Sequence, residues 1–299
     1  MNRISDLMEP SDCLVGPGVQ LFLGAADDCT DRVQLNSGTI AAPTATTGEA
    51  YEDDAIIPRA GWRDPTVADR KTLIAESCPS FSGNAISVLR LPSELLDPFR
   101  PLRIAAAKYR SREMFLPIIG SEDCSRATDA VIAYLQDRLA EKGTHPLGGL
   151  QIDRWISTRP PGLQTLTVNP ATHARVGLHI DSWDEHDLEL GRREYSPNRV
   201  CINLGSEDRF FVYLNTPIGQ MYKAVKRKSK SSICDYGPSA IATEFMRSFP
   251  SHPVVRLRLR PGEAYVAPTE NIVHDGSSID MNAMDVALLI RGRFSLLPG

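Results

Sequence analysis

No apolar stretch of the sequence approaches the roughly 18–20 residues needed to span a bilayer. The start, Met1 to Asp6, lacks the charged-then-apolar pattern of a secretory signal. The six cysteines are scattered, and no two of them form a C-x-x-C pair. This spacing does not suit a disulfide framework or a zinc knuckle, and it fits thiols in a reducing compartment. We therefore expect a cytoplasmic protein that does not act at a membrane.

The chain also lacks a strong excess of either charge, with a formal net charge of -4 over 299 residues. This balance argues against a general nucleic-acid binder. Residues 1–60 hold ten acidic and three basic side chains (net -7), which leaves 27 acidic and 30 basic side chains (net +3) for the remainder. A mildly basic body suits an anionic small substrate or cosubstrate, although solubility alone explains it equally well. The basic run at 223–231 is short and poor in interleaved aromatic residues, so we interpret it as a solvated loop or flap.

The first half of the sequence has mixed patterns. The clearest helix is predicted at 125–142, with Ser125 or Thr128 as its cap and apolar residues at helical spacing. Residues 36–66 are rich in Ala, Thr, Gly, Pro and acids, so we expect an irregular segment or a lid over an active site. Weaker elements are expected at 12–24, 66–78, 85–91, 102–109 and 114–119.

From residue 147 the pattern becomes that of short strands separated by turn signals. About eight such strands, preceded by helical support, predict a sandwich or barrel of the jelly-roll type. We expect a mainly β fold with flanking helices in a single domain, 1–299, with an N-terminal extension and supporting helices over 1–146 and the jelly-roll core over 147–299. The elements are predicted at 150–156, 163–168, 174–181, 199–204, 209–214, 238–248 (a helix), 254–260, 263–267 and 286–296.

One short motif organises this second half. His179 and Asp181 form a His-x-Asp pair at the end of an apolar, strand-like run, and His274 follows another such run 93 residues after Asp181. Residues i and i+2 of a strand point to the same face, so the pair can reach one metal ion together. Two histidines and one carboxylate on one face form the site of non-haem Fe(II) oxygenases. We therefore predict His179, Asp181 and His274 as metal ligands and catalytic residues.

In the order H-x-D, H and R, residues 150–296 resemble the Fe(II)/2-oxoglutarate-dependent oxygenases, whose core is a double-stranded β-helix. The resemblance implies that the triad binds Fe(II) and that a basic residue on the last core strand holds the far carboxylate of 2-oxoglutarate. Arg291 and Arg293, 17 and 19 residues after His274, are the candidates. The family commonly places this arginine nearer to the distal histidine. Arg293 with Ser295 matches the R-x-S form of part of the family.

The resemblance also implies a reaction class. 2-Oxoglutarate would take two open positions of the metal and O2 the third, and a C–H bond of the substrate would be hydroxylated or otherwise oxidised by desaturation, epoxidation or cyclisation. A carboxylate at position 181 separates the chain from related halogenases, which have a small residue there. The sequence lacks the E-N-G and P-G-S-H signature of the phytanoyl-CoA hydroxylase branch and any obvious peptide-recognition module. We therefore expect a small soluble substrate, an amino-acid-derived or other natural product in a biosynthetic pathway.

Further residues are candidates for the site. Asn203 and Ser295 could contact the cosubstrate, and Trp183 and Tyr213 could contact the substrate, although packing or turn roles explain each of them as well.

Two alternatives to the oxygenase interpretation remain open. The histidines could be ordinary strand-end residues, with Asp181 capping a turn. The chain could also be a cupin-like metal-binding protein without 2-oxoglutarate turnover, such as a sensor, an isomerase or a lyase. The neighbouring Asp184 and His186 are better explained as loop residues than as ligands, because extended spacing separates them from His179.

Overall fold

The computed structural model describes residues 16–23, 31–43, 50–77, 82–139, 153–182, 190–228 and 237–295. The strands are β1 Gln20–Phe22, β2 Val33–Leu35, β3 Thr39–Ala41, β4 Tyr51–Pro58, β5 Ala85–Arg90, β6 Asp153–Arg159, β7 Arg175–Gly177, β8 Asn198–Asn203, β9 Arg209–Pro217, β10 Val255–Leu259, β11 Glu263–Ala267, β12 Ile272–Ser277 and β13 Asp285–Gly292. The α-helices are α1 Val67–Leu73, α2 Ser93–Leu96, α3 Arg100–Lys108, α4 Leu116–Ile119, α5 Glu122–Leu139, α6 Ile218–Lys228 and α7 Pro238–Ser248. Short 3-10 helices lie at Ser82–Asn84, Asp97–Phe99, Arg112–Phe115 and Leu190–Tyr195.

Two facing sheets form the core. One has the strand order β1-β5-β11-β8-β13-β6, the other has the order β12-β9-β10-β2, and a small sheet β3-β4-β7 lies beside them. From β8 onward the chain alternates between the two large sheets: β8 lies in the first, β9 and β10 in the second, β11 in the first, β12 in the second and β13 in the first. This alternation is that of a jelly roll of the double-stranded β-helix type, so the predicted fold class is confirmed.

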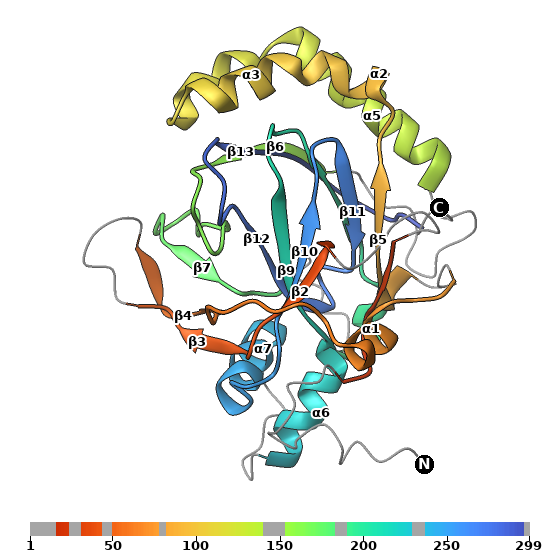
Figure 1. Ribbon diagram of the computed structural model, residues 1–299, viewed down its shortest axis with the longest axis vertical. Coiled ribbons are helices and arrows are strands. Elements are labelled where there is room, and N and C mark those ends of the chain that lie inside the picture. The colour runs from red at the N-terminus through yellow and green to blue at the C-terminus, as the bar shows by residue number, and fades with distance from the viewer. Residues whose placement is uncertain are drawn as a thin grey trace.

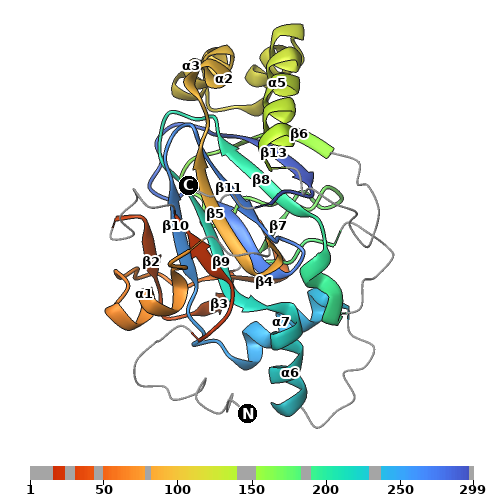
Figure 2. The same cartoon turned by 90° about the vertical axis from the view of Figure 1, so that its right-hand side faces the viewer.

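Helices lie at the two ends of this core, as Figures 1 and 2 show: α2, α3 and α5 lie over one end and α6 and α7 at the other. The central strand β8 reflects this layering, because all six of its residues are buried. Val200 and Ile202 pack toward the helices α2 to α5, and Cys201 points between the two sheets. The near-continuous hydrophobic run of this strand therefore follows from burial on both faces.

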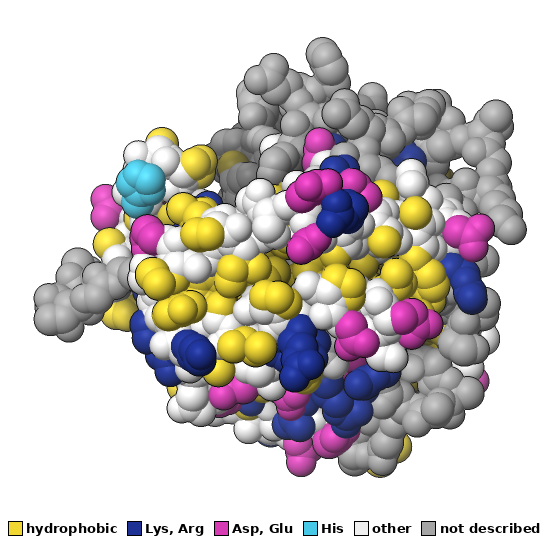
Figure 3. Space-filling view, turned by 90° about the horizontal axis from the view of Figure 1, so that it is seen from above, with side chains coloured by type: hydrophobic (Ala, Val, Ile, Leu, Met, Phe, Trp, Pro, Cys, Tyr) yellow, Lys and Arg dark blue, Asp and Glu magenta, His cyan; other side chains and the backbone are white. Residues whose placement is uncertain are grey.

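The outer surface of the helical layer carries apolar side chains between groups of charged ones (Figure 3). Ile104, Met114 and Leu116 of α3 to α4 are about half exposed. Helix α5 overlaps the predicted range but begins three residues earlier, at Glu122, because the Ser121 hydroxyl, and not Ser125 or Thr128, accepts the N–H of Cys124 at 3.2 Å. Residues 140–142 of the predicted range lie outside the described residues.

Most predicted elements of the second half are confirmed, and α7 and β11 match their predicted ranges residue for residue. Two predictions were wrong. Residues 163–168 form no strand, and only Val168 makes an isolated bridge, to Arg175. The basic run is a helix over its described part, since α6 extends to Lys228; residues 229–231 lie outside the described residues.

The prediction of an irregular segment at 36–66 was also wrong for its described residues. This segment contains β3 and β4, and β4 pairs in parallel with β7, the strand that leads to His179. The sequence of β4 does not alternate between apolar and polar residues, because pairing with β3 and β7, and not one solvent-facing side, defines this strand. In the N-terminal half, β1, β2 and β5 also extend the two large sheets. The division into an extension and a core within one domain stays a prediction.

Among the helices that the structure describes, none combines the length and the apolar character that crossing a membrane requires.

Candidate metal centre

The two histidines of the predicted triad are brought together by a direct backbone pair. His179 and His274 form an antiparallel bridge, with His179 N–H donating to the His274 carbonyl at 3.1 Å and His274 N–H donating to the His179 carbonyl at 2.7 Å. Gly177 allows the chain to arrive there: its φ is +75°, and a Cβ would lie 2.5 Å from the Ile56 carbonyl oxygen of β4. A side chain at position 177 would therefore strain and displace the strand that carries His179.

Both imidazole rings are oriented in the same way. His179 Nδ1 lies 3.0 Å from the carbonyl oxygen of Gly177, and His274 Nδ1 lies 3.2 Å from that of Ile272. A carbonyl oxygen only accepts, so each Nδ1 must carry the proton and each Nε2 must carry the lone pair. A register shift between Ile272 and His274 in β12 helps to direct the second ring.

The two Nε2 atoms face the carboxylate of Asp181. His179 Nε2 is 3.7 Å from Asp181 Oδ1, and His274 Nε2 is 3.7 Å from Asp181 Oδ2. These distances are too long for hydrogen bonds, and the buried Nε2 of His274 has no hydrogen-bond partner. Within the part of the chain that the structure describes, these three residues form the group whose ligand atoms all lie within 4.8 Å of one another. Two ligand atoms that lie about 2.1 Å from one ion, on the same side of it, are about 3 Å apart, so the three side chains would have to move closer together by roughly 1–2 Å to hold an ion.

Asp181 is held on its backbone and its side chain. Its N–H donates to the Thr269 carbonyl at 3.1 Å, and its carbonyl accepts from Arg193 at 3.4 Å. Its Oδ2 lies 2.6 Å from a guanidinium nitrogen of Arg199, a buried residue at the start of β8. Burial would raise the pKa of Asp181, but Arg199, together with His274 and His179, holds it well below its usual range. The carboxylate is therefore charged at neutral pH.

The environment also sets the charge of the histidines. Burial lowers the pKa of His274 to about 3, so this ring is neutral at pH 7. Burial would also lower the pKa of His179, but the carboxylates of Asp181 and Asp275 outweigh it and raise that pKa above its usual value. Asp275 Oδ2 lies 3.8 Å from His179 Nδ1, and its Oδ1 accepts the Thr167 hydroxyl at 2.9 Å. A neutral imidazole and an ionised carboxylate are the forms that bind a divalent metal.

The two predicted arginines lie apart from each other. Arg291 is buried on β13, directly opposite Arg199 of β8 in the strand register, and its guanidinium contacts Glu270 at 2.7 and 2.9 Å. Arg293 is not on the strand, because β13 ends at Gly292, and its guanidinium donates to the Tyr195 carbonyl at 2.7 Å. The predicted strand at 286–296, which contained both arginines, was therefore wrong for Arg293.

The remaining predicted residues have different surroundings. Asn203 donates to the carbonyls of Glu207 and Leu259 and accepts the N–H of Gly205, so it closes the turn after β8. Ser295 donates to the Leu139 carbonyl of α5. These contacts give both side chains turn and packing roles, and among the described residues neither contacts the triad. Their cosubstrate role stays a prediction. Trp183 lies outside the described residues.

Tyr213 lies beside the metal centre. It is the direct cross-strand partner of His274 between β9 and β12, so both side chains leave the sheet on the same face. The side chain is fully buried, it stacks with Phe211 at 5.4 Å between ring centroids, and its hydroxyl has no hydrogen-bond partner. Burial raises the pKa of this hydroxyl well above its usual value. A buried, unpaired hydroxyl costs about 1–3 kcal/mol, which marks it as a group that a ligand could satisfy.

Sequence reasoning missed Arg199. The signal was present in the alternation of Arg199, Cys201 and Asn203 along the predicted strand at 199–204, which puts an arginine on the inner face.

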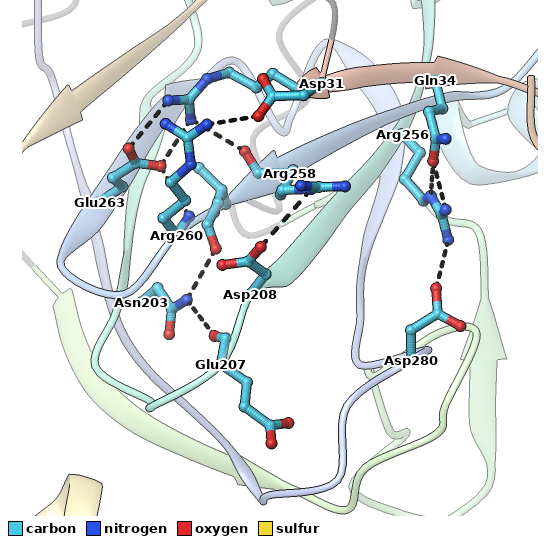
Figure 4. Close-up of polar contacts among 12 residues, drawn as sticks. Asp31, Gln34, Asn203, Glu207, Asp208, Arg256, Arg258, Arg260, Glu263 and Asp280 are labelled. Atoms are coloured by element: carbon cyan, nitrogen blue, oxygen red, sulfur yellow. Dashed lines mark hydrogen bonds and ion pairs between the residues drawn. The ribbon is translucent and has the colours of Figure 1, made fainter. Parts of the chain in front are cut away.

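A second polar cluster lines a surface cleft of about 420 Å³ on the outer face of β10, shown in Figure 4. Arg256 donates to Gln34 at 2.5 and 3.1 Å and to Asp280 at 3.3 Å, and its guanidinium lies over the rings of Trp62 and Phe210 at 4.7 and 4.3 Å. Arg258 lies 3.8 Å from Asp208. The two arginines of this cleft are each close to a carboxylate, and Glu207 accepts the backbone N–H groups of Asn282 and Ala283, which is typical of a structural cluster.

No protein-family model matches the chain, and no curated protein matches it. Among solved structures, the chain is similar to the Kdo hydroxylase KdoO, a non-haem Fe(II) α-ketoglutarate-dependent dioxygenase. The structure of KdoO with α-ketoglutarate and Fe(III) is 14% identical, over 70% of this chain and 79% of that one, with a TM-score of 0.37. The cobalt(II) complex is 13% identical, over 70% and 80%, with a TM-score of 0.38. At these values, the function assigned to this chain rests on the geometry of its own site.

Proposed function

We propose that the chain is a non-haem iron enzyme, a 2-oxoglutarate-dependent dioxygenase that oxidises a C–H bond of a small molecule. The observation that carries this proposal is the convergence of the two Nε2 lone pairs on the Asp181 carboxylate, at 3.7 Å and without hydrogen bonds. Ordinary strand-end histidines would pair their ring nitrogens with protein groups or solvent. Here the buried Nε2 of His274 has neither a partner nor access to water, which a metal would remedy.

The donor set selects the metal class. Two imidazoles and one carboxylate on one side of an ion leave positions open on the other side, as non-haem Fe(II) oxygenases require. When bound, Fe(II) would supply the activation of O2 in the presence of 2-oxoglutarate. The chain's part would be to hold the ion from one side through His179, Asp181 and His274. The backbone bridge between the two histidines would keep these ligands in register.

For the cosubstrate we propose a pocket between the two sheets, next to His274. The Tyr213 hydroxyl is buried there without a partner, and it could donate to a carboxylate oxygen. Of the two predicted arginines, Arg291 is the better candidate, since it is buried and shares its face with Arg199. Replacing Tyr213 with Phe is expected to weaken 2-oxoglutarate binding about tenfold while metal binding is kept, as isothermal titration would measure.

One observation favours a second candidate. The guanidinium groups of Arg291 and Arg293 are already engaged, by Glu270 and by the Tyr195 carbonyl. A cupin-like protein that binds a metal without turning over 2-oxoglutarate would tolerate that arrangement. The first candidate requires a cation for the far carboxylate of the cosubstrate.

Succinate formation separates the two candidates. The protein is incubated with Fe(II), 2-oxoglutarate and ascorbate, with and without O2, since slow turnover can proceed without the true substrate. We expect succinate only with O2 in the native protein and none in His274→Ala. Metal binding without O2-dependent succinate would support the cupin-like candidate and contradict the oxygenase.

We propose that the substrate is a small molecule and, more specifically, an amino-acid-derived or other natural product. The more specific proposal is supported by the sequence alone, which lacks a peptide- or nucleic-acid-recognition motif. Stimulation of succinate formation by members of a compound panel would test it, and stimulation by peptides alone would contradict it.

A further inference from the structure

A buried arginine contacts the carboxylate of the candidate metal centre. The guanidinium of Arg199 lies 2.6 Å from Asp181 Oδ2, and the side chains of the two residues are only 8% and 7% exposed. The contact is an ion pair, and it is screened little because both partners are buried. It involves Oδ2, which also lies 3.7 Å from His274 Nε2, whereas the other oxygen, Oδ1, lies 3.7 Å from His179 Nε2.

Arg199 is also rigidly placed. It lies at the start of β8, a central strand of the six-stranded sheet, between Ala267 of β11 and Arg291 of β13. Its guanidinium lies 5.3 Å from the centre of the Trp155 ring of β6, within the range of a cation–π contact. The position of the guanidinium relative to Asp181 is therefore set by the sheet and not by a flexible loop.

The contact bears on how many positions of the metal stay open. A carboxylate can bind a metal through one oxygen or through both. Through one oxygen, the triad fills three of about six octahedral positions and leaves room for a two-point ligand and for O2. Through both oxygens it would fill four and leave only two, which the cosubstrate alone would occupy.

We propose that Arg199 is a positioning residue that reserves Oδ2 of Asp181 and so keeps this ligand bound to the metal through one oxygen. The inference rests on the proposed function, because it concerns the open positions of the same centre. It adds the requirement that the position for O2 depends on an arginine that binds neither the metal nor O2.

The test uses nitric oxide as a probe for the O2 position. The native protein and Arg199→Gln are loaded anaerobically with Fe(II) and 2-oxoglutarate, and the electron paramagnetic resonance signal of the iron–nitric oxide adduct is measured. We expect a full signal in the native protein and a loss of most of it in Arg199→Gln, with Fe(II) still bound. In turnover, KM for O2 should rise about 10–100-fold, the range typical of residues that orient metal ligands, while KM for 2-oxoglutarate changes little.

Two further variants make the result specific. Arg199→Lys keeps the charge but offers a single ammonium on a flexible stem, so its adduct signal is expected to fall between the other two; it carries the test if Arg199→Gln does not fold. Arg32→Gln is the matched control, because Arg32 is an equally buried arginine paired with Glu263 at 2.7 Å, away from the triad. Its signal should equal that of the native protein.

An unchanged adduct signal and an unchanged KM for O2 in both Arg199 variants would overturn the inference and leave the proposed function intact. A native protein that binds no Fe(II) would overturn the proposed function and this inference together. A loss of signal in Arg32→Gln equal to that in Arg199→Gln would also overturn it, since the effect would then follow from removing any buried arginine.

Discussion

Two polar clusters of this molecule lie on opposite faces of the same four-stranded sheet, and they differ in whether their groups are satisfied. At the outer cleft, Arg256 donates hydrogen bonds to Gln34 and Asp280, and its guanidinium lies over two aromatic rings. At the inner centre, His179, Asp181 and His274 face one another at 3.7 Å without a hydrogen bond. Charge and burial alone therefore do not mark a functional site. The inner centre is distinguished by two imidazole Nε2 atoms that converge on one carboxylate, and that of His274 is buried without a hydrogen-bond partner.

The largest effect is expected from removing a ligand at the inner centre. His274→Ala should weaken Fe(II) or Co(II) binding by more than about 100-fold, since even residues behind the ligands are worth 10–100-fold. Anaerobic isothermal titration measures this. The control, His252→Gln, removes a half-buried histidine that does not belong to the triad and should bind metal as the native protein does. Equal losses in both variants would show that the effect is one of folding.

The outer cleft should respond to mutation in stability and not in metal binding. Arg256→Met leaves Gln34 and Asp280 without their donor and removes a cation from between two rings, so it should lower the free energy of unfolding by about 2 kcal/mol. Urea unfolding measures this change. A change in metal affinity beyond about twofold would contradict the division between the two clusters.

Acid should destabilise the fold through histidines whose pKa is lowered in the folded chain. Burial lowers the pKa of His252 to about 4, and its Nε2 lies 3.0 Å from the Thr216 hydroxyl. The unfolded chain binds a proton at this residue below pH ~6.5 and the folded chain does not until pH ~4, so stability falls as the pH is lowered through this window. The loss at pH 5 is about 2 kcal/mol relative to pH 8.

His252→Gln should remove that share of the pH dependence, as urea unfolding at the two pH values would measure. The part of the pH dependence that is due to His274 would remain, since burial lowers the pKa of that residue as well. A pH dependence that is the same in both proteins would contradict the assignment to His252.

The smallest effect on metal affinity is expected from changing Asp275, which lies behind His179. Asp275→Asn removes the charge 3.8 Å from His179 Nδ1 but keeps an acceptor for Thr167, so metal affinity should fall by up to about tenfold. Thr167→Val removes the hydroxyl and keeps the charge. If both variants lose the same affinity, packing and not charge is responsible.

The grouping of His179, Asp181 and His274 could be predicted from sequence. His179 and Asp181 are two residues apart at the end of an apolar run, so strand geometry puts them on one face, and the family resemblance added His274. The helix α7 and the strand β11 were predictable for the same reason, since each has a clear period and a turn or proline at its start.

What could not be predicted depends on contacts between distant segments. The strand β4 exists through its pairing with β3 and β7, and its own sequence shows no alternation. The roles of the arginines were equally hidden: the strand pattern shows that Arg199 and Arg291 face inward, but not that one meets Asp181 and the other Glu270. A strand pattern gives the face of a side chain, and only the register between strands gives its partner.

The inner triad of His179, Asp181 and His274 is proposed to bind Fe(II) together with 2-oxoglutarate. The most direct test of this proposal is an anaerobic titration of the native protein with Fe(II) and then 2-oxoglutarate, followed by visible absorption. We expect a charge-transfer band that develops only when Fe(II) and 2-oxoglutarate are both present and that is absent in His274→Ala. Bound metal without a band would exclude 2-oxoglutarate as the cosubstrate, and a protein that binds no metal would contradict the account.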